Sequence, residues 1–114
     1  MPTLIIKTNA MAAPEDRRQL LKDASTLVAD LLGKPERYVM VILEPTPEMC
    51  FGGDMNPLAY LELKSLGLPE DRCKDFSAAL CDFVEEHLNV PQDRVYIEFA
   101  SPPRHLFGFN GGTF

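Results

Sequence analysis

A tetrapeptide that recurs in the two halves of the chain constrains the fold more than any other sequence feature. Pro14-Glu15-Asp16-Arg17 is repeated as Pro69-Glu70-Asp71-Arg72, and an amphipathic helical pattern follows each copy. A second pair, Pro35-Glu36-Arg37 and Pro91-Gln92-Asp93-Arg94, stands just before a short segment rich in strand-forming residues in each half. We interpret the chain as two copies of a β-α-β unit.

The expected elements come in the same order in both units. They are a strand over residues 3–8, a helix over 14–33 with Gly33 as its cap, a strand over 38–43, a strand over 58–64, a helix over 69–88 and a strand over 95–99. Because residues 38–43 include no polar side chain, we expect a buried strand there. The intervening residues 44–57, which are rich in proline and glycine, are expected to form a loop.

Each β-α-β unit should make a right-handed crossover between parallel strands. Two such units combine into an α/β (α+β) fold, with a four-stranded mixed sheet and two helices on one face. The strands at 38–43 and 95–99 carry apolar or aromatic residues on both faces. An uncovered sheet face of that kind predicts a homo-oligomer.

Composition limits the other possibilities. The 114 residues fit one domain, spanning residues 1–114. Acidic residues outnumber basic ones by 17 to 11, giving a net charge of −6, so we expect no nucleic-acid or membrane partner. The three cysteines lack CxxC spacing and the two histidines lack ligand partners at metal-binding spacing, so free thiols and no metal site are expected. The start of the chain does not have the pattern of a secretory signal, which predicts a cytoplasmic protein, or one exported without a signal peptide.

Pro2 is the residue with the most distinctive chemistry. If Met1 is removed, Pro2 becomes an N-terminal secondary amine. The pKa of a free α-amino group is about 7.7–8.0, and an apolar pocket or a neighbouring cation lowers it. Such a group would be a base poised near neutral pH. The alternative is that Pro2 merely precedes the first strand.

Short blocks along the whole chain carry a family resemblance. They are Pro2, Thr8-Asn9, Gly33-Lys34-Pro35, Phe51-Gly52-Gly53, Leu63, Ser65-Leu66-Gly67, Asp93-Arg94-Val95-Tyr96-Ile97, Asn110 and Thr113-Phe114. In these residues the chain resembles the macrophage migration inhibitory factor family, which includes D-dopachrome tautomerase and lies within the tautomerase superfamily. The resemblance implies a homotrimer whose pockets lie between subunits.

The resemblance also implies roles for individual residues. Pro2 would be the catalytic acid and base, and Lys34 would hold a substrate carboxylate or an oxyanion. The backbone at Leu66, with Ser65 beside it, would help to bind substrate, and Tyr96 would come from the adjacent subunit. Taken without the resemblance, Lys34 could simply complement a helix C-terminus and Tyr96 could be an ordinary strand aromatic.

Four further positions complete the expected pocket. Phe107, Phe109 and Phe114 match residues that form apolar walls, although without the resemblance they could be ordinary core residues. Glu98 stands where the family commonly has Asn. A carboxylate there would repel an anionic substrate and favour the protonated form of Pro2.

The implied activity is keto-enol tautomerisation of small aromatic 2-oxo acids such as phenylpyruvate, or of dopachrome-like compounds, without metal or organic cofactor. An alternative is a cytokine-like protein that binds a receptor and retains a vestigial pocket. A ferredoxin-like regulatory module has the same element order, but Pro2 and the aromatic residues near the C-terminus argue against it.

Overall fold

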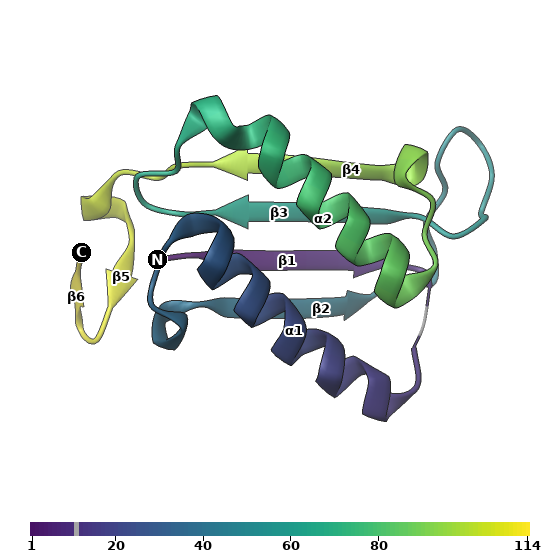
Figure 1. Cartoon of the computed structure of the whole chain (residues 1–114), viewed down its shortest axis with the longest axis horizontal. Helices are drawn as coiled ribbons and strands as arrows, with labels where there is room; N and C mark the ends of the chain where they lie inside the picture. Colours follow the sequence, from purple (N-terminus) through teal and green to yellow (C-terminus); the bar gives the residue numbers. More distant parts are fainter. Residues whose placement is uncertain (11) are drawn as a thin grey trace.

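A computed structural model describes residues 1–10 and 12–114 and contains the expected mixed sheet (Figure 1). The four strands are β1 (Thr3–Thr8), β2 (Met40–Pro45), β3 (Ala59–Lys64) and β4 (Val95–Ala100), in the spatial order β2-β1-β3-β4. β1 is parallel to β2 and antiparallel to β3, and β3 is parallel to β4. Both predicted β-α-β units are therefore confirmed.

Two helices, α1 (Pro14–Leu32) and α2 (Cys73–Leu88), cover the same face of the sheet (Figure 1). α1 has proline in its first turn and ends where Gly33 adopts a left-handed φ of 62°, as its sequence predicts. α2 begins four residues later than expected, because residues Glu70–Arg72 form a 3₁₀ turn instead of its first α-helical turn. Another 3₁₀ turn, Glu36–Tyr38, precedes β2.

The core lies between the helices and the sheet. Successive side chains of a strand point to opposite faces, so every second residue of β1 and β3 is buried under the helices. The strand residues in this layer include Leu4, Ile6, Leu61 and Leu63, and the helix residues include Leu20, Val28, Phe76, Leu80 and Val84.

The prediction of a buried strand over residues 38–43 is wrong. β2 is an edge strand that begins at Met40, and Met40 is 59% exposed. Val41 and Leu43 pack against the core, while Met40 and Ile42 point to the face that has no helices. In the single chain, this apolar strand is thus buried on only one of its two faces.

The open face of the sheet mixes apolar and charged side chains. β4 places Tyr96 and Glu98 there, and ion pairs join Lys7 to Glu44 at 3.8 Å and Lys64 to Glu62 at 3.9 Å on the same face. β4 therefore carries apolar or aromatic residues on both faces, as expected, with Tyr96 on the open face and Val95, Ile97 and Phe99 toward the core.

A C-terminal hairpin was not predicted. β5 (Gly108–Phe109) pairs with β6 (Gly112–Thr113), and the hairpin lies beside the N-terminus at one end of the sheet (Figure 1). Asn110 and Gly111 form the turn with positive φ angles of 51° and 77°. Two consecutive positive φ values are characteristic of the tight turns that suit a hairpin. The long loop between β2 and β3 lies at the opposite end of the molecule (Figure 1).

Candidate active site

A cavity of about 220 Å³ opens between the N-terminus, the start of β2 and the C-terminal hairpin. Its apolar walls include Met1, Tyr38, Phe107, Phe109 and Phe114. The structure therefore gathers the three phenylalanines predicted to be pocket walls, and it places them around a surface cavity outside the core.

Aromatic contacts hold these walls together. The ring centroids of Phe109 and Phe114 are 5.1 Å apart in a stacked arrangement, and Tyr38 meets Phe109 edge-on at 5.7 Å. Phe107 lies 5.9 Å from Phe114, and the Phe114 N–H donates a hydrogen bond to the Phe107 carbonyl at 3.2 Å. Offset and edge-on pairs of this kind are favourable beyond the apolar area that they bury. Tyr38 is a wall residue that the sequence analysis missed.

The N-terminus forms one border of this cavity. Pro2 is fully buried, and its carbonyl accepts a hydrogen bond from the Met40 N–H at 3.0 Å, which fixes the chain beside the start of β2. Burial lowers the pKa of the Met1 amine below its ordinary value, and the positive charges of Lys34 and then Arg104 lower it further. Two cations thus act on the N-terminal amine, and sequence reasoning identified only Lys34.

Lys34 extends from the cap of α1 toward the turn after β3. Its Nζ donates a hydrogen bond to the Leu66 carbonyl at 3.3 Å, and the Ser65 hydroxyl donates to the same carbonyl at 3.3 Å. The structure therefore brings Lys34, Ser65 and Leu66 together. Lys34 thus makes a specific hydrogen bond to this turn, in addition to any favourable interaction of its charge with the C-terminus of α1.

Tyr96 and Glu98 lie elsewhere in the single chain. β4 is separated from β2 by two strands, a distance of about 14 Å at the usual strand spacing. Through β3, Tyr96 stands level with Lys7, near the end of β1 that is farther from Pro2. Tyr96 is 66% exposed, and its ring centroid lies 4.8 Å from that of Phe51. The structure does not bring Tyr96 or Glu98 to the N-terminal cavity of their own chain.

Two cations near the cavity had no recognised signal in the sequence. Arg37 lines the cavity, with its guanidinium carbon 4.8 Å from the centroid of the Tyr38 ring, and Arg104 influences the Met1 amine from the 3₁₀ turn before the hairpin. The repeat containing Arg37 predicted the position of a strand and gave no reason to expect a pocket residue.

The described residues hold neither a metal-ion cluster nor a membrane-spanning helix. No group of three His, Cys, Asp or Glu side chains in residues 1–10 and 12–114 is arranged to hold a metal ion. Within the same residues, neither helix combines the length and the apolar character that crossing a membrane requires.

Comparison with known proteins gives consistent matches along the whole chain. The chain is 35% identical to macrophage migration inhibitory factor of Xenopus tropicalis, over all of this chain and 99% of that protein. It is 36% identical to the homolog from Trichinella spiralis, over the full length of both.

Solved structures share the fold. The macrophage migration inhibitory factor homologue from Prochlorococcus marinus superposes with a TM-score of 0.91 at 39% identity, covering 98% of both chains. The protein from Toxoplasma gondii gives a TM-score of 0.91 at 36% identity, covering 98% of this chain and 99% of the other. The sequence profile of the family described as Macrophage migration inhibitory factor (MIF) matches residues 1–114. The chain therefore belongs to the macrophage migration inhibitory factor family.

Proposed function

We propose that the protein is a keto-enol tautomerase that acts on small aromatic 2-oxo acids such as phenylpyruvate, or on dopachrome-like compounds, with Pro2 as its general acid and base. The observation that carries this proposal is the aromatic cavity beside an N-terminal amine whose pKa is lowered by burial and by two cations. An aromatic ring fits such walls, and a base with a lowered pKa is suited to proton transfer near neutral pH.

The proposal requires removal of Met1. While Met1 is present, the Pro2 nitrogen is an amide and cannot accept a proton. Met1 is half-buried and lines the cavity, so its removal would leave the Pro2 amine facing the space that Met1 occupies. Lys34 and Arg104 would then act on an amine one residue farther along the chain, again disfavouring its protonated form.

The reaction moves one proton. Neutral Pro2 removes a proton from the carbon beside the substrate carbonyl, the electron pair of that C–H bond forms the new C=C bond, and the π pair of the carbonyl moves onto its oxygen. Lys34 stabilises the negative charge on the oxygen or holds the substrate carboxylate. The Pro2 ammonium then supplies the proton that forms the O–H bond of the enol. The aromatic walls hold the substrate ring and exclude water from the amine.

The proposal includes a homotrimer in which each pocket is completed by Tyr96 and Glu98 of a neighbouring subunit. Two observations support it. Both side chains lie on the open face of the sheet, away from the cavity of their own chain. That face also carries the exposed side chain of Met40. Sedimentation equilibrium should give about three times the 12.8 kDa chain mass, and a stable monomer at micromolar concentration would contradict the trimer.

The decisive experiment is a steady-state assay with phenylpyruvate and a dopachrome ester. The protein with a free Pro2 amine, verified by intact mass spectrometry, should be active, and the protein that retains Met1 should not. Pro2→Gly replaces a rigid secondary amine by a flexible primary one and should lower kcat/KM by about 10²–10⁴-fold. Unchanged turnover in Pro2→Gly would remove Pro2 from the mechanism.

A second candidate is a cytokine-like protein that binds a receptor and keeps the cavity as a vestige. The names of its relatives, which refer to inhibition of macrophage migration, favour this candidate. It makes the opposite prediction for the same assay: folded trimer with a free Pro2 amine would turn over neither substrate.

A further inference from the structure

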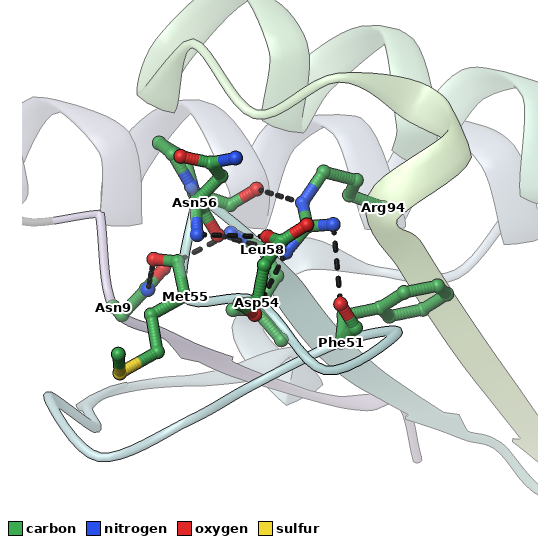
Figure 2. A network of polar contacts seen from close by, with 8 residues as sticks. Asn9, Phe51, Asp54, Met55, Asn56, Leu58 and Arg94 are labelled. Atoms are coloured by element: carbon green, nitrogen blue, oxygen red, sulfur yellow. Dashed lines mark hydrogen bonds and ion pairs between the residues drawn. The ribbon is translucent and has the colours of Figure 1, made fainter.

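Arg94 lies at the centre of a polar network with the loop between β2 and β3 (Figure 2). This loop is at the end of the sheet opposite the C-terminal hairpin (Figure 1). The Arg94 guanidinium donates hydrogen bonds to four backbone carbonyls of the loop between β2 and β3. They are those of Phe51 at 3.3 Å, Asp54 at 3.2 Å, Asn56 at 3.0 Å and Pro57 at 3.0 Å. Arg94 also forms an ion pair with the Asp54 carboxylate at 2.7 Å.

These contacts depend on the shape of the arginine side chain. A guanidinium presents five N–H donors in one rigid plane, whereas a lysine has three donors on a single rotating ammonium. The Arg94 side chain is only 16% exposed, so its loop contacts are largely shielded from water. One arginine can therefore organise several carbonyls that point in different directions.

A tight turn lies within the loop between β2 and β3. Phe51 and Asp54 exchange two backbone hydrogen bonds across a tight turn, in which Gly52 and Gly53 have positive φ angles of 61° and 84°. An added side chain would be strained at both glycines. The turn fixes residues 51–54 relative to one another, and Arg94 fixes them relative to β4.

The other end of the loop is attached to β1. The Asn9 side chain donates to the Met55 carbonyl at 2.9 Å and accepts from the Leu58 N–H at 3.0 Å (Figure 2). The buried Thr8 hydroxyl donates to the Leu58 carbonyl at 2.8 Å. Three sequence blocks that are far apart in the chain, Thr8-Asn9, Phe51-Gly52-Gly53 and Asp93-Arg94, thus meet in one network.

The network determines where the Phe51 ring lies. The Arg94 guanidinium carbon is 5.4 Å from the centroid of that ring. The same ring contacts Tyr96, with the two ring centroids 4.8 Å apart. Phe51, Tyr60 and Tyr96 line a second cavity of about 300 Å³. Because Tyr96 is mostly exposed, Phe51 is the aromatic ring that supports it within the described part of the chain.

We propose that Arg94 is a positioning residue, which holds Phe51 against Tyr96 and so orients the ring that Tyr96 contributes to the pocket of a neighbouring subunit. This inference rests on the proposed function. Arg94 itself touches no reacting atom, so its loss should weaken substrate binding while leaving proton transfer by Pro2 nearly unchanged.

Kinetics of the trimer with a free Pro2 amine test this positioning role. Arg94→Lys keeps the charge and loses the planar donors, and it should raise KM for phenylpyruvate about tenfold with kcat within about twofold. Arg18→Lys is the matched control, because Arg18 is exposed on α1 and should leave both constants unchanged. An unchanged KM in folded, trimeric Arg94→Lys would overturn the proposal.

A double variant tests the path from Arg94 to Tyr96. Phe51→Leu should raise KM in the same direction, and Arg94→Lys in the Phe51→Leu background should add no more than about a further twofold. If the two effects multiply fully, Arg94 does not act through Phe51 and the proposal fails.

Ring-to-ring nuclear Overhauser effects between Phe51 and Tyr96 provide a readout that needs no turnover. They should be present in the wild type and Arg18→Lys and lost in Arg94→Lys. Retained effects would show that Arg94 does not hold the two rings. If the wild type proves inactive, the proposed function fails, and this measurement still decides whether Arg94 positions the rings.

A milder variant covers the case in which Arg94→Lys does not fold. Asp54→Asn removes the charge partner at an exposed position and leaves the loop carbonyls in place. It should raise KM by about two- to threefold and weaken the nuclear Overhauser effects between the Phe51 and Tyr96 rings. No change in either measurement would contradict the role given to the network.

Discussion

The Lys34 ammonium donates a hydrogen bond to the Leu66 carbonyl, 3.3 Å away, and so joins the end of α1 to the turn after β3. This contact holds a long, flexible cation in one place, near the N-terminal amine on which its charge acts. The electrostatics of the cavity therefore depend on a bond between the first β-α-β unit and the second.

Removing the Lys34 charge should raise the pKa of the N-terminal amine. A nearby cation disfavours the protonated amine, so Lys34→Gln moves the pKa back toward its ordinary value, and Arg104→Gln does the same to a smaller extent. NMR titration of the amine measures the pKa directly, and the acid limb of the pH-rate profile should move to higher pH. Lys22→Gln, on the exposed side of α1, serves as the control. A pKa that moves equally in Lys22→Gln and Lys34→Gln would rule out a specific effect of Lys34.

Glu98→Asn should favour an anionic substrate. Glu98 forms no ion pair within residues 1–10 and 12–114, and the carboxylate partner of Arg94 is Asp54. In the proposed trimer its charge faces the neighbouring pocket, so Glu98→Asn should raise kcat/KM for phenylpyruvate about fivefold and change that for an uncharged dopachrome ester much less. Equal responses of the two substrates would place Glu98 outside the pocket.

Glu98→Asn should also change the pKa of Tyr60, which lies in the same chain. Burial raises the pKa of Tyr60, and the charges of Glu98 and then Glu62 raise it further. Glu98→Asn should therefore lower the Tyr60 pKa part of the way toward its ordinary value, which ultraviolet titration of the tyrosines can follow. Glu86→Gln, on an exposed part of α2, should leave the titration unchanged.

Asp23 should stabilise the fold in a pH-dependent way. His87 Nε2 on α2 lies 3.1 Å from Asp23 Oδ2 on α1, and this hydrogen bond lowers the Asp23 pKa. A depressed carboxyl pKa contributes stability above the unfolded value of about 3.9, and the contribution disappears as pH falls through the folded value. Asp23→Asn should lower the urea midpoint at pH 5.5, and the difference from wild type should shrink in stronger acid. Asp30→Asn, exposed on α1, should show no such trend.

The hairpin turn offers a matched pair of glycine substitutions. Gly111 has a φ of 77°, so Gly111→Ala should cost about 1–2 kcal/mol and loosen the hairpin that carries Phe109. Gly112 lies outside the left-handed region, and a Cβ there would make only an ordinary contact with the Phe109 carbonyl at 3.9 Å. Hydrogen exchange in the hairpin should accelerate in Gly111→Ala and much less in Gly112→Ala. Similar exchange in both variants would show that the turn conformation does not hold the cavity wall.

The sequence predicts the order of the main helices and strands because both units keep a clear pattern of apolar residues. It does not predict the helix start in the second unit, since the same tetrapeptide begins an α-helix at Pro14 and a 3₁₀ turn at Glu70. Identical local sequence takes two forms there, so tertiary packing decides between them. Asn110-Gly111 is a local hairpin signal, and it is too short to reveal which strands it joins or where they lie.

The site was predictable only in part. The clustering of Phe107, Phe109 and Phe114 followed from the family resemblance, and periodicity alone would have placed them in the core. Tyr38 and Arg104 approach the N-terminus through two 3₁₀ turns, and hydrophobic patterns do not reveal where such turns direct a side chain. Their roles required the three-dimensional structure.

The two β-α-β units also differ in how each uses the arginine in the 3₁₀ turn before its closing strand. Arg37 and Arg94 lie in the 3₁₀ turns Glu36–Tyr38 and Gln92–Arg94, which precede the closing strands of the two units. Each guanidinium stands over an aromatic ring, at 4.8 Å from the centroid of Tyr38 and 5.4 Å from that of Phe51. Arg37 borders the aromatic cavity at one end of the molecule, and Arg94 organises the loop at the other end. A repeat in the sequence therefore does not bring a repeat in the contacts, because each 3₁₀ turn takes its neighbours from the end of the sheet at which it lies.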